Sequence, residues 1–216
     1  MADPVKPSAR PYHAPQRAAA AARTREAIVT AAKDVFERLG WPGATMRGIA
    51  GQAGVSVKTV EALYRTKAEL LKHVVDYAIA GDLRPVPVSG RELAAAMQAA
   101  PDAPAFLGLH ARQVTDIAER SAQIFWVAEQ AAPADPDIAR LWAQMTGNRR
   151  SGARWAATTL LGKPGVPPHV GQDYAEEVFW LAIDPGTYRS LTLGGGLSPD
   201  GFETWIRNYY DKMLLH

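Results

Sequence analysis

The sequence predicts an all-α protein of two domains, and three observations support this. Apolar residues recur at helical spacing along most of the chain, alanine-rich runs with few β-branched stretches favour helices, and no segment alternates convincingly as a strand does. The 216 residues suffice for one small and one mid-sized domain. A hydrophobic content of 47% is enough to fill a packed core.

The chain begins with a segment that lacks helical periodicity. Residues 1–16 hold four prolines, which predicts a disordered arm. A helix is expected from about Arg17 to Leu39, where Gly40 ends it. Its apolar stripe is Ile28, Ala31, Val35, Phe36 and Leu39.

Residues 45–67, TMRGIAGQAGVSVKTVEALYRTK, predict two short helices joined by a tight turn. Gly54 supplies the positive φ that ends the first helix, and Ser56 is the N-cap of the second. Val60 and Tyr64, four residues apart, give the second helix an inward face. The outward face then carries Val57, Lys58 and Glu61. This is the helix-turn-helix plan for reading the major groove of DNA.

The same stretch resembles the N-terminal domain of TetR-type transcriptional regulators over about residues 20–82. The resemblance rests on LGWPGATMRGIA at 39–50, AGVSVKTV at 53–60, the aromatic Tyr64 and TKAELL at 66–71. It implies a helical DNA-binding regulator with a divergent regulatory domain. The family usually has aromatic residues that hold a phosphate where Glu61 and Leu63 stand, and a small residue in place of Lys58. That phosphate contact is therefore not carried over.

The candidate DNA-binding residues are Thr45, Arg47, Ser56, Val57, Lys58, Thr59, Glu61 and Lys67. Lys58 lies where recognition helices meet base edges and suits guanine; the alternative is a surface ion pair with Glu61. Thr45 caps the preceding helix, whose amide end can also hold a phosphate. Arg47 and Lys67 are expected phosphate partners.

Smaller roles remain open for the other candidates and for the arm. Val57 suits a thymine methyl group, Thr59 a phosphate or base, and Glu61 either accepts from cytosine or repels the backbone. In the arm and at its end, Lys6, Arg10 and Arg17 either follow DNA phosphates or belong to a solvated leader.

Helices are expected along the rest of the chain. Thr66 to Glu69 forms a capping box that opens a helix to about Gly81. A break with two prolines follows at 83–90. The next helix is expected to end at about Ala100, and two helices joined near 119–121 are expected over 106–132. A helix is expected from Pro136 to about Leu161 and another at about 170–183. A short helical turn over 184–193 and a last helix at 199–214 complete the chain.

Large aromatic residues concentrate in the second half of the chain. Aromatic side chains on several helices can line an apolar pocket with a few polar anchors, although ordinary core packing explains many such residues. The candidate ligand-binding residues are Phe106, His110, Gln113, Phe125, Trp126, Glu129, Trp142, Trp155 and Phe179. The ligand would be small and apolar or aromatic.

The last helix carries more large apolar residues than its own domain needs. By the resemblance, the helices at 170–183 and 199–214 form a four-helix bundle with a second copy; the alternative is packing within the chain. The candidate dimer residues are Tyr174, Val178, Leu181, Phe202, Trp205, Ile206, Tyr209 and Met213. A two-fold dimer would read a near-palindromic operator.

Composition restricts the remaining possibilities. The chain has no cysteine, which excludes disulfides and thiolate metal sites. No apolar run approaches about 20 residues and the start lacks a signal core, so a cytoplasmic protein is expected. Residues 1–80 hold 12 Lys/Arg against 7 Asp/Glu, a net charge of +5, and residues 81–216 hold 12 against 15, or −3. A basic first part suits DNA.

The sequence thus predicts an arm at 1–16, a three-helix helix-turn-helix DNA-binding domain at 17–65, and a linking helix with a helical ligand-binding and dimerisation domain at 66–216. We expect a sequence-specific regulator, a repressor released from its operator by a small molecule. No cofactor, metal site or catalytic motif is expected. The alternatives are a regulator without small-molecule input, a non-specific architectural DNA binder, and a small helical enzyme.

Overall fold

The computed structural model describes residues 14–84 and 90–216, and every regular element in these ranges is helical. Nearly all of the predicted arm lies outside the described residues, and so does most of the break predicted at 83–90. The first helix begins at Ala14, three residues before the predicted start.

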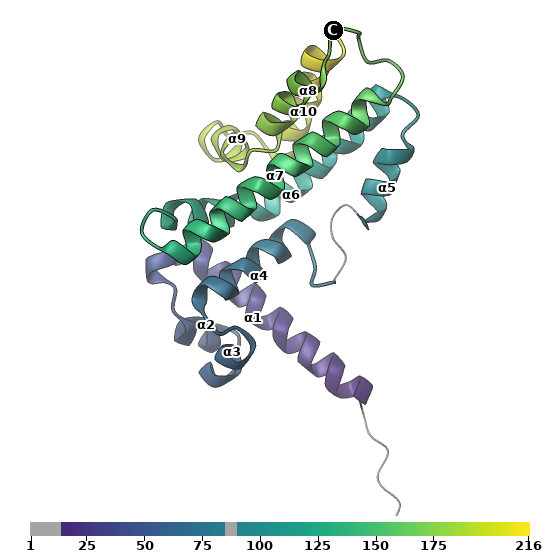
Figure 1. Cartoon of the computed structure of the whole chain (residues 1–216). Coiled ribbons are helices and arrows are strands. Elements are labelled where there is room, and N and C mark those ends of the chain that lie inside the picture. The colour runs from purple at the N-terminus through teal and green to yellow at the C-terminus, as the bar shows by residue number, and fades with distance from the viewer. Residues whose placement is uncertain (1–13, 85–89) are drawn as a thin grey trace, which may run out of the picture.

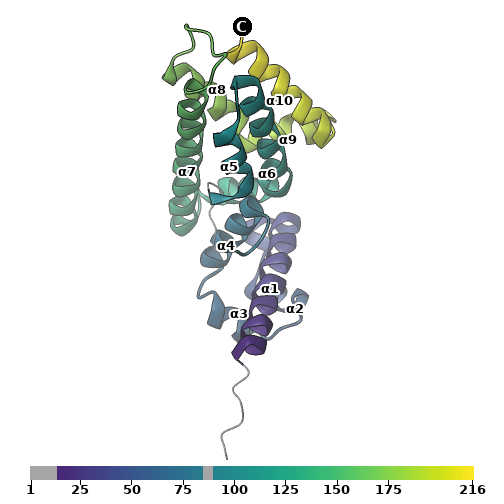
Figure 2. The same cartoon turned by 90° about the vertical axis from the view of Figure 1, so that its right-hand side faces the viewer.

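Four helices form the N-terminal part: α1 (Ala14–Gly43), α2 (Met46–Gln52), α3 (Val57–Leu63) and α4 (Lys67–Ala80). Figures 1 and 2 show α2 and α3 at one end of the molecule, braced by α1 and α4. Gly40 adopts φ 65° and ψ −179°, a conformation that only glycine takes readily. It kinks α1 rather than ending it, and the helical segment extends to Gly43.

The predicted capping box at the start of α4 forms in modified form. Thr66 Oγ1 accepts from the Glu69 amide at 3.0 Å, as expected. The Glu69 carboxylate accepts from the amide of Arg65 instead of that of Thr66, at 3.0 Å. Gly81, with φ 81°, closes the helix in the left-handed conformation.

The C-terminal part contains α5 (Glu92–Ala99), α6 (Ala103–Ala131), α7 (Pro136–Leu161), α8 (Gln172–Ala182), α9 (Pro185–Arg189), the π-helical turn η2 (Ser190–Gly194) and α10 (Pro199–Leu214). Figure 1 shows α6 and α7 side by side along the length of this part, with α8 and α10 at the end remote from α3. Asp135 caps α7 and Pro136 opens it, as predicted.

The prediction of two helices over residues 106–132 is wrong, because α6 is continuous through the expected join. The polar residues there are satisfied inside one helix or by its neighbour. Ser121 is buried and donates to the carbonyl of Ile117 at 2.7 Å. Arg120 reaches across to α4, where it donates to the carbonyls of Ala78 and Ile79 at 3.2 Å each.

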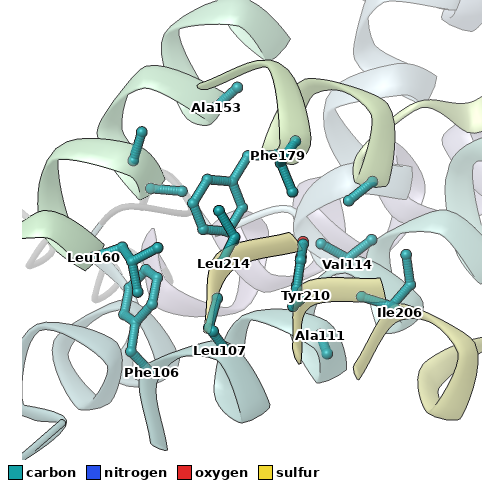
Figure 3. Packing of buried hydrophobic residues seen from close by; sticks show 14 of the residues in the cluster. Phe106, Leu107, Ala111, Val114, Ala153, Leu160, Phe179, Ile206, Tyr210 and Leu214 are labelled. Atoms are coloured by element: carbon teal, nitrogen blue, oxygen red, sulfur yellow. The ribbon is translucent and has the colours of Figure 1, made fainter. Parts of the chain in front are cut away.

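Buried side chains form two clusters. One fills the space among α6, α7, α8 and α10, where Phe106, Phe179 and Tyr210 are each fully buried (Figure 3). The other combines the inward faces of α1 to α4 with the end of α6 and the first half of α7, including Ile124 and Ile138. The helix-turn-helix therefore shares its core with the C-terminal part of the chain.

Candidate functional site

The helix-turn-helix is held by side-chain caps at the predicted positions. Thr45 Oγ1 accepts from the Gly48 amide at 3.0 Å and caps α2. Ser56 Oγ accepts from the Thr59 amide at 3.1 Å and lies 2.8 Å from Thr59 Oγ1. Gly54 has φ 67°, which permits the turn between the two helices. The hydroxyls of Thr45, Ser56 and Thr59 thus organise the backbone of this site.

Three charged candidates lie on the surface of the helix-turn-helix. Arg47 on α2 and Lys58 and Glu61 on α3 are exposed. The described residues include no ion pair between Lys58 and Glu61, so the lysine is available for another contact. Val57 is only half exposed and packs partly against the second core cluster, which limits its reach outward.

Lys67 is engaged within the protein. Its ammonium donates to the carbonyls of Trp41 at 2.7 Å and Ala44 at 3.0 Å. It also lies 4.0 Å from the centre of the Trp41 ring, within cation–π range. Burial lowers the pKa of Lys67, and the charge of Asp135 opposes this effect. Two of the three donors of this ammonium therefore serve the end of α1.

A cavity of about 970 Å³ lies among α4, α5, α6 and α7, close to the start of α9. This is within the size range of small-molecule sites. The apolar part of its wall includes Met97, Val114, Ile117, Phe125, Leu141, Met145, Trp155 and Ile183. Its polar part includes His73, His110, Gln113, Ser121, Gln144, Asn148 and Arg149.

The cavity brings together four of the nine predicted ligand residues: His110, Gln113, Phe125 and Trp155. The other five do not line it. Phe106 and Phe179 are buried in the first core cluster, where their rings pack around His110. Trp142 packs edge-on against Phe125 at 6.3 Å, behind the wall. Trp126 and Glu129 are exposed.

His110 is a neutral anchor at the inner end of the cavity. Its Nδ1 lies 2.8 Å from the hydroxyl of Tyr210, and both side chains are buried. Burial lowers the pKa of His110 to about 3 and raises that of Tyr210 well above its usual value. The pair therefore forms an uncharged hydrogen bond between α6 and α10 at physiological pH.

Arg149 is the buried cation of the cavity wall, and sequence reasoning missed it. One of its Nη atoms donates to Asp184 at 2.7 Å, and the guanidinium lies 4.4 Å from the centre of the Trp180 ring. Burial lowers the pKa of Arg149, and Asp184 opposes this effect. Its buried Nε has no acceptor among the described residues. One donor of a largely buried guanidinium thus remains unused.

Other wall residues of α7 were also missed, although their spacing carried a signal. Leu141, Asn148 and Gly152 line the cavity together with the predicted Trp155, and the four recur at intervals of three, four or seven along the helix. A polar residue and a glycine at positions of an apolar stripe indicate a face that borders a cavity rather than solid core.

The predicted dimer residues divide into inward and outward sets. Val178, Phe202 and Ile206 are buried inside the chain's own core. Tyr174, Leu181 and Trp205 are 44%, 56% and 36% exposed, although all are large and apolar or aromatic. Tyr209 stacks on Trp205 at 5.4 Å, and Met213 accepts a weak bond from Tyr174. The outward set forms an apolar face across α8 and α10.

Within residues 14–84 and 90–216, no helix has the length and apolar character needed to cross a bilayer. The same residues contain no group of three or more His, Asp or Glu side chains arranged to hold a metal ion.

The fold and the capped α2–α3 pair define a helix-turn-helix protein with a second, helical domain. Residues 28–74 match the sequence model of the bacterial regulatory proteins of the tetR family. The predicted resemblance to TetR-type regulators is thereby confirmed for the N-terminal domain. A comparison with curated proteins finds no match.

Solved structures of regulators share the whole fold. A TetR-family protein from Rhodococcus sp. is similar with a TM-score of 0.65 and 14% identity, over 89% of this chain and 98% of that one. A regulator from Saccharomonospora viridis, solved in complex with choline, gives 0.65 and 14%, over 89% and 97%. A TetR regulator from Haloarcula marismortui gives 0.60 and 18%, over 88% and 98%. The predicted all-α architecture is confirmed, and the fold is that of DNA-binding transcriptional regulators.

The buried, neutral His110 predicts an acid-sensitive step in stability. In the unfolded chain its pKa is near 6.5, whereas in the native protein it is about 3. The unfolded chain therefore takes up a proton that the native protein does not, and stability falls as the pH drops below about 6.5. Between about pH 7.5 and 5.5, His110 should lower the free energy of unfolding by about 1.4 kcal/mol.

Urea denaturation followed by circular dichroism at both pH values checks this expectation. The variant His110→Gln, which keeps a polar group beside Tyr210, should lose about 1.4 kcal/mol less than the wild type over the same interval. An identical pH dependence in the two proteins would contradict a neutral native His110.

Proposed function

We propose that this protein is a cytoplasmic, homodimeric transcriptional repressor that binds a near-palindromic DNA operator and is released by a small molecule. The observation that carries the proposal is Lys58, exposed beside the capped N-terminus of α3 in a tetR-family domain. Recognition helices of this motif contact base edges with the residues of that first turn. The proposal assigns the chain no catalytic step.

Each candidate residue has a separate role in DNA binding. Lys58 donates to guanine, and Glu61 one turn further along accepts from cytosine or disfavours other sequences. Arg47 binds a phosphate beside the groove. Thr45, Ser56 and Thr59 fix the N-terminal ends of α2 and α3. The exposed amides at these helix ends then face the phosphate backbone of the DNA. Lys67 contributes by holding the end of α1 in place.

The cavity supports a ligand with an apolar body and one hydrogen-bond acceptor. Phe125, Met145 and Trp155 supply apolar and aromatic surface, and the unused Nε of Arg149 supplies a donor. The choline complex of the S. viridis regulator indicates that this fold accommodates small organic molecules. In the present chain a buried arginine in the wall disfavours a quaternary ammonium ion and favours a neutral or anionic ligand.

Helix α4 provides a route from the cavity to DNA. Its residues His73, Tyr77 and Ile79 border the cavity, while Leu70 and Val74 belong to the core shared with α1. Arg120 holds the last carbonyls of α4. A ligand that prefers one position of α4 shifts the spacing of the two α3 helices in a dimer, and linkage makes the effect reciprocal.

The decisive experiment is enrichment of bound DNA. Purified protein would be incubated with fragmented DNA from its own source at about 150 mM salt, beside Lys58→Ala, and the retained fragments sequenced. We expect a near-palindromic motif with half-sites about one helical turn apart, which Lys58→Ala loses or blurs. Retained fragments without a common motif would support the architectural alternative. No retention would overturn the DNA-binding proposal.

The cavity can be tested by filling it from α7. Gly152 lines the cavity and a Cβ added there would have no heavy atom within 4 Å, so Gly152→Trp should occupy the space. We expect binding of the apolar dye N-phenyl-1-naphthylamine, followed by its fluorescence, to weaken more than about tenfold. Gly147→Trp is the matched control, because Gly147 lies on the same helix with similar open space outside the cavity wall. Equal dye binding by both variants would contradict a ligand site there.

The role of the outward face of α8 and α10 as a dimer interface can be tested by introducing a charged residue into it. Leu181→Asp places a carboxylate on a 56% exposed leucine at the centre of the proposed interface. Burying that charge in a dimer is costly, so sedimentation velocity should detect a monomer with unchanged helical content. Leu39→Asp, on a 47% exposed leucine of α1, is the control and should stay dimeric. A Leu181→Asp dimer as stable as the wild type would move the interface elsewhere.

A further inference from the structure

Helix α1 extends well beyond the core that it braces. The first buried side chain of α1 is Ile28, and among the described side chains of residues 16–27 only Thr24 is partly buried. The helix from Ala14 to Ala27 is about 20 Å long, and the side chains of residues 16–27 other than Thr24 are exposed. Its alanine run at 18–22 explains why it remains helical without a core.

The projecting part of α1 is strongly basic. Arg17, Arg23 and Arg25 are its charged residues before Glu26, so residues 16–25 carry a net charge of +3. All three are exposed. Neither Arg23 nor Arg25 has a hydrogen bond or ion pair within the described part of the chain. The unpaired charge of Arg25 suits an anionic partner outside the protein.

The two faces of this projection differ. Arg25 lies three and four residues before the fully buried Ile28 and Val29, so it continues the inward face of α1. Arg17, eight residues earlier, is rotated by about 80° from Arg25 and so lies nearer to the side of Arg25 than to that of Arg23. Arg23 lies four residues before the exposed Ala27 and seven before the exposed Thr30, on the opposite face. One side of the helix therefore presents two arginines, and Arg25 is in line with the bracing surface.

This face lies at the DNA-reading end of the molecule. Figures 1 and 2 both show the start of α1 at the same end as α2 and α3, away from α8 and α10. Arg25 is near enough to Tyr64, the C-cap residue of α3, for its charge to oppose the rise that burial causes in the pKa of that tyrosine. The basic face thus lies close to the C-terminal end of α3.

The exposed cations of α2 and α3 are Arg47 and Lys58, and other positions of these two helices add none. The side chain at Glu61 is an exposed acid, Leu63 is apolar, and the ammonium of Lys67 is engaged by carbonyls of α1. Duplex DNA carries one phosphate charge per about 1.7 Å of axis, and cations must compensate it along the interface. A helix of about 20 Å with arginines on one side fits that requirement.

We propose that the inward face of residues 16–27 is a second DNA contact, in which Arg25 and Arg17 bind phosphates of the duplex beside the half-site read by α3. The alanines between them allow the helix to approach the backbone closely. This contact adds affinity without sequence preference. It rests on the proposed DNA-binding function and extends it to a surface outside the helix-turn-helix.

The test is the salt dependence of DNA affinity. Fluorescence anisotropy with a labelled mixed-sequence duplex of about 40 base pairs, from about 50 to 200 mM KCl, gives the slope of log K against log salt. The magnitude of that slope falls by about 0.9 for each phosphate that the protein no longer neutralises, so Arg25→Gln should lower it by about 1.8 in a dimer. Arg25→Lys, which keeps the charge, should retain most of the slope.

Arg23→Gln is the matched control, because it removes the same charge two residues away on the opposite face. Its slope should remain close to that of the wild type. A wild-type slope for Arg25→Gln, or an equal reduction for Arg25→Gln and Arg23→Gln, would overturn the proposal. Circular dichroism confirms that each variant keeps its helices. If the wild type itself binds neither this duplex nor genomic fragments, the proposed function fails instead.

Discussion

The rest of the structure depends on one constraint. Helix α4 is buried between the helix-turn-helix part and the C-terminal helices. Helices α2 and α3 have seven residues each and together bury Ile49, Ala50 and Val60. So small a unit cannot fill a core of its own. The core is completed by α1, by Leu70 and Val74 of α4 and by residues of α6 and α7. The orientation of α2 and α3 is consequently set through α1, which packs on α2 as well as on α4 and α6.

Because that core is shared, a change in the cavity cannot remain local. Close-packed interiors transmit displacement rather than absorb it. The residues of α4 that border the cavity alternate along one helix with those that contact α1, so both surfaces move together. The guanidinium of Arg120 and the left-handed Gly81 fix the far end of α4. In the proposed mechanism, movement at the cavity is transmitted to the start of α4, where Thr66 caps the helix and Glu69 accepts from the amide of Arg65 in the turn after α3.

Local sequence signals predicted the reading head well, because each depends on a few neighbouring residues. Gly54, Ser56 and Thr45 occupy the turn and cap positions that their chemistry requires, and the all-α class follows from periodicity. The cavity was predicted only in part, since it depends on which faces of distant helices meet. His110 and Trp155 were found, but Arg149 looked like one of several surface arginines. The predicted join near Glu119–Ser121 is absent, because Arg120 and Ser121 find partners across or within the helices. The domain boundary near residue 66 stays a prediction. Because one buried core extends across that position, packing alone does not separate two domains there.

Lys67 shows that the surroundings of a lysine, and not its residue type alone, decide which groups its charge contacts. Gly40 kinks α1, and the carbonyls of Trp41 and Ala44 at its end need donors. A lysine opening the next helix meets that need, and the Trp41 ring stabilises the cation further. The ammonium thereby holds the end of α1 against the start of α4, and a role of Lys67 in binding DNA stays a prediction. With an acid at position 61 as well, α3 carries little net charge, which suits discrimination between bases more than general attraction. In the proposed interface, Arg47 on α2 and the exposed arginines that extend α1 past the helix-turn-helix supply that attraction. On this proposal, specificity and electrostatic affinity are divided between α3 and its neighbouring helices.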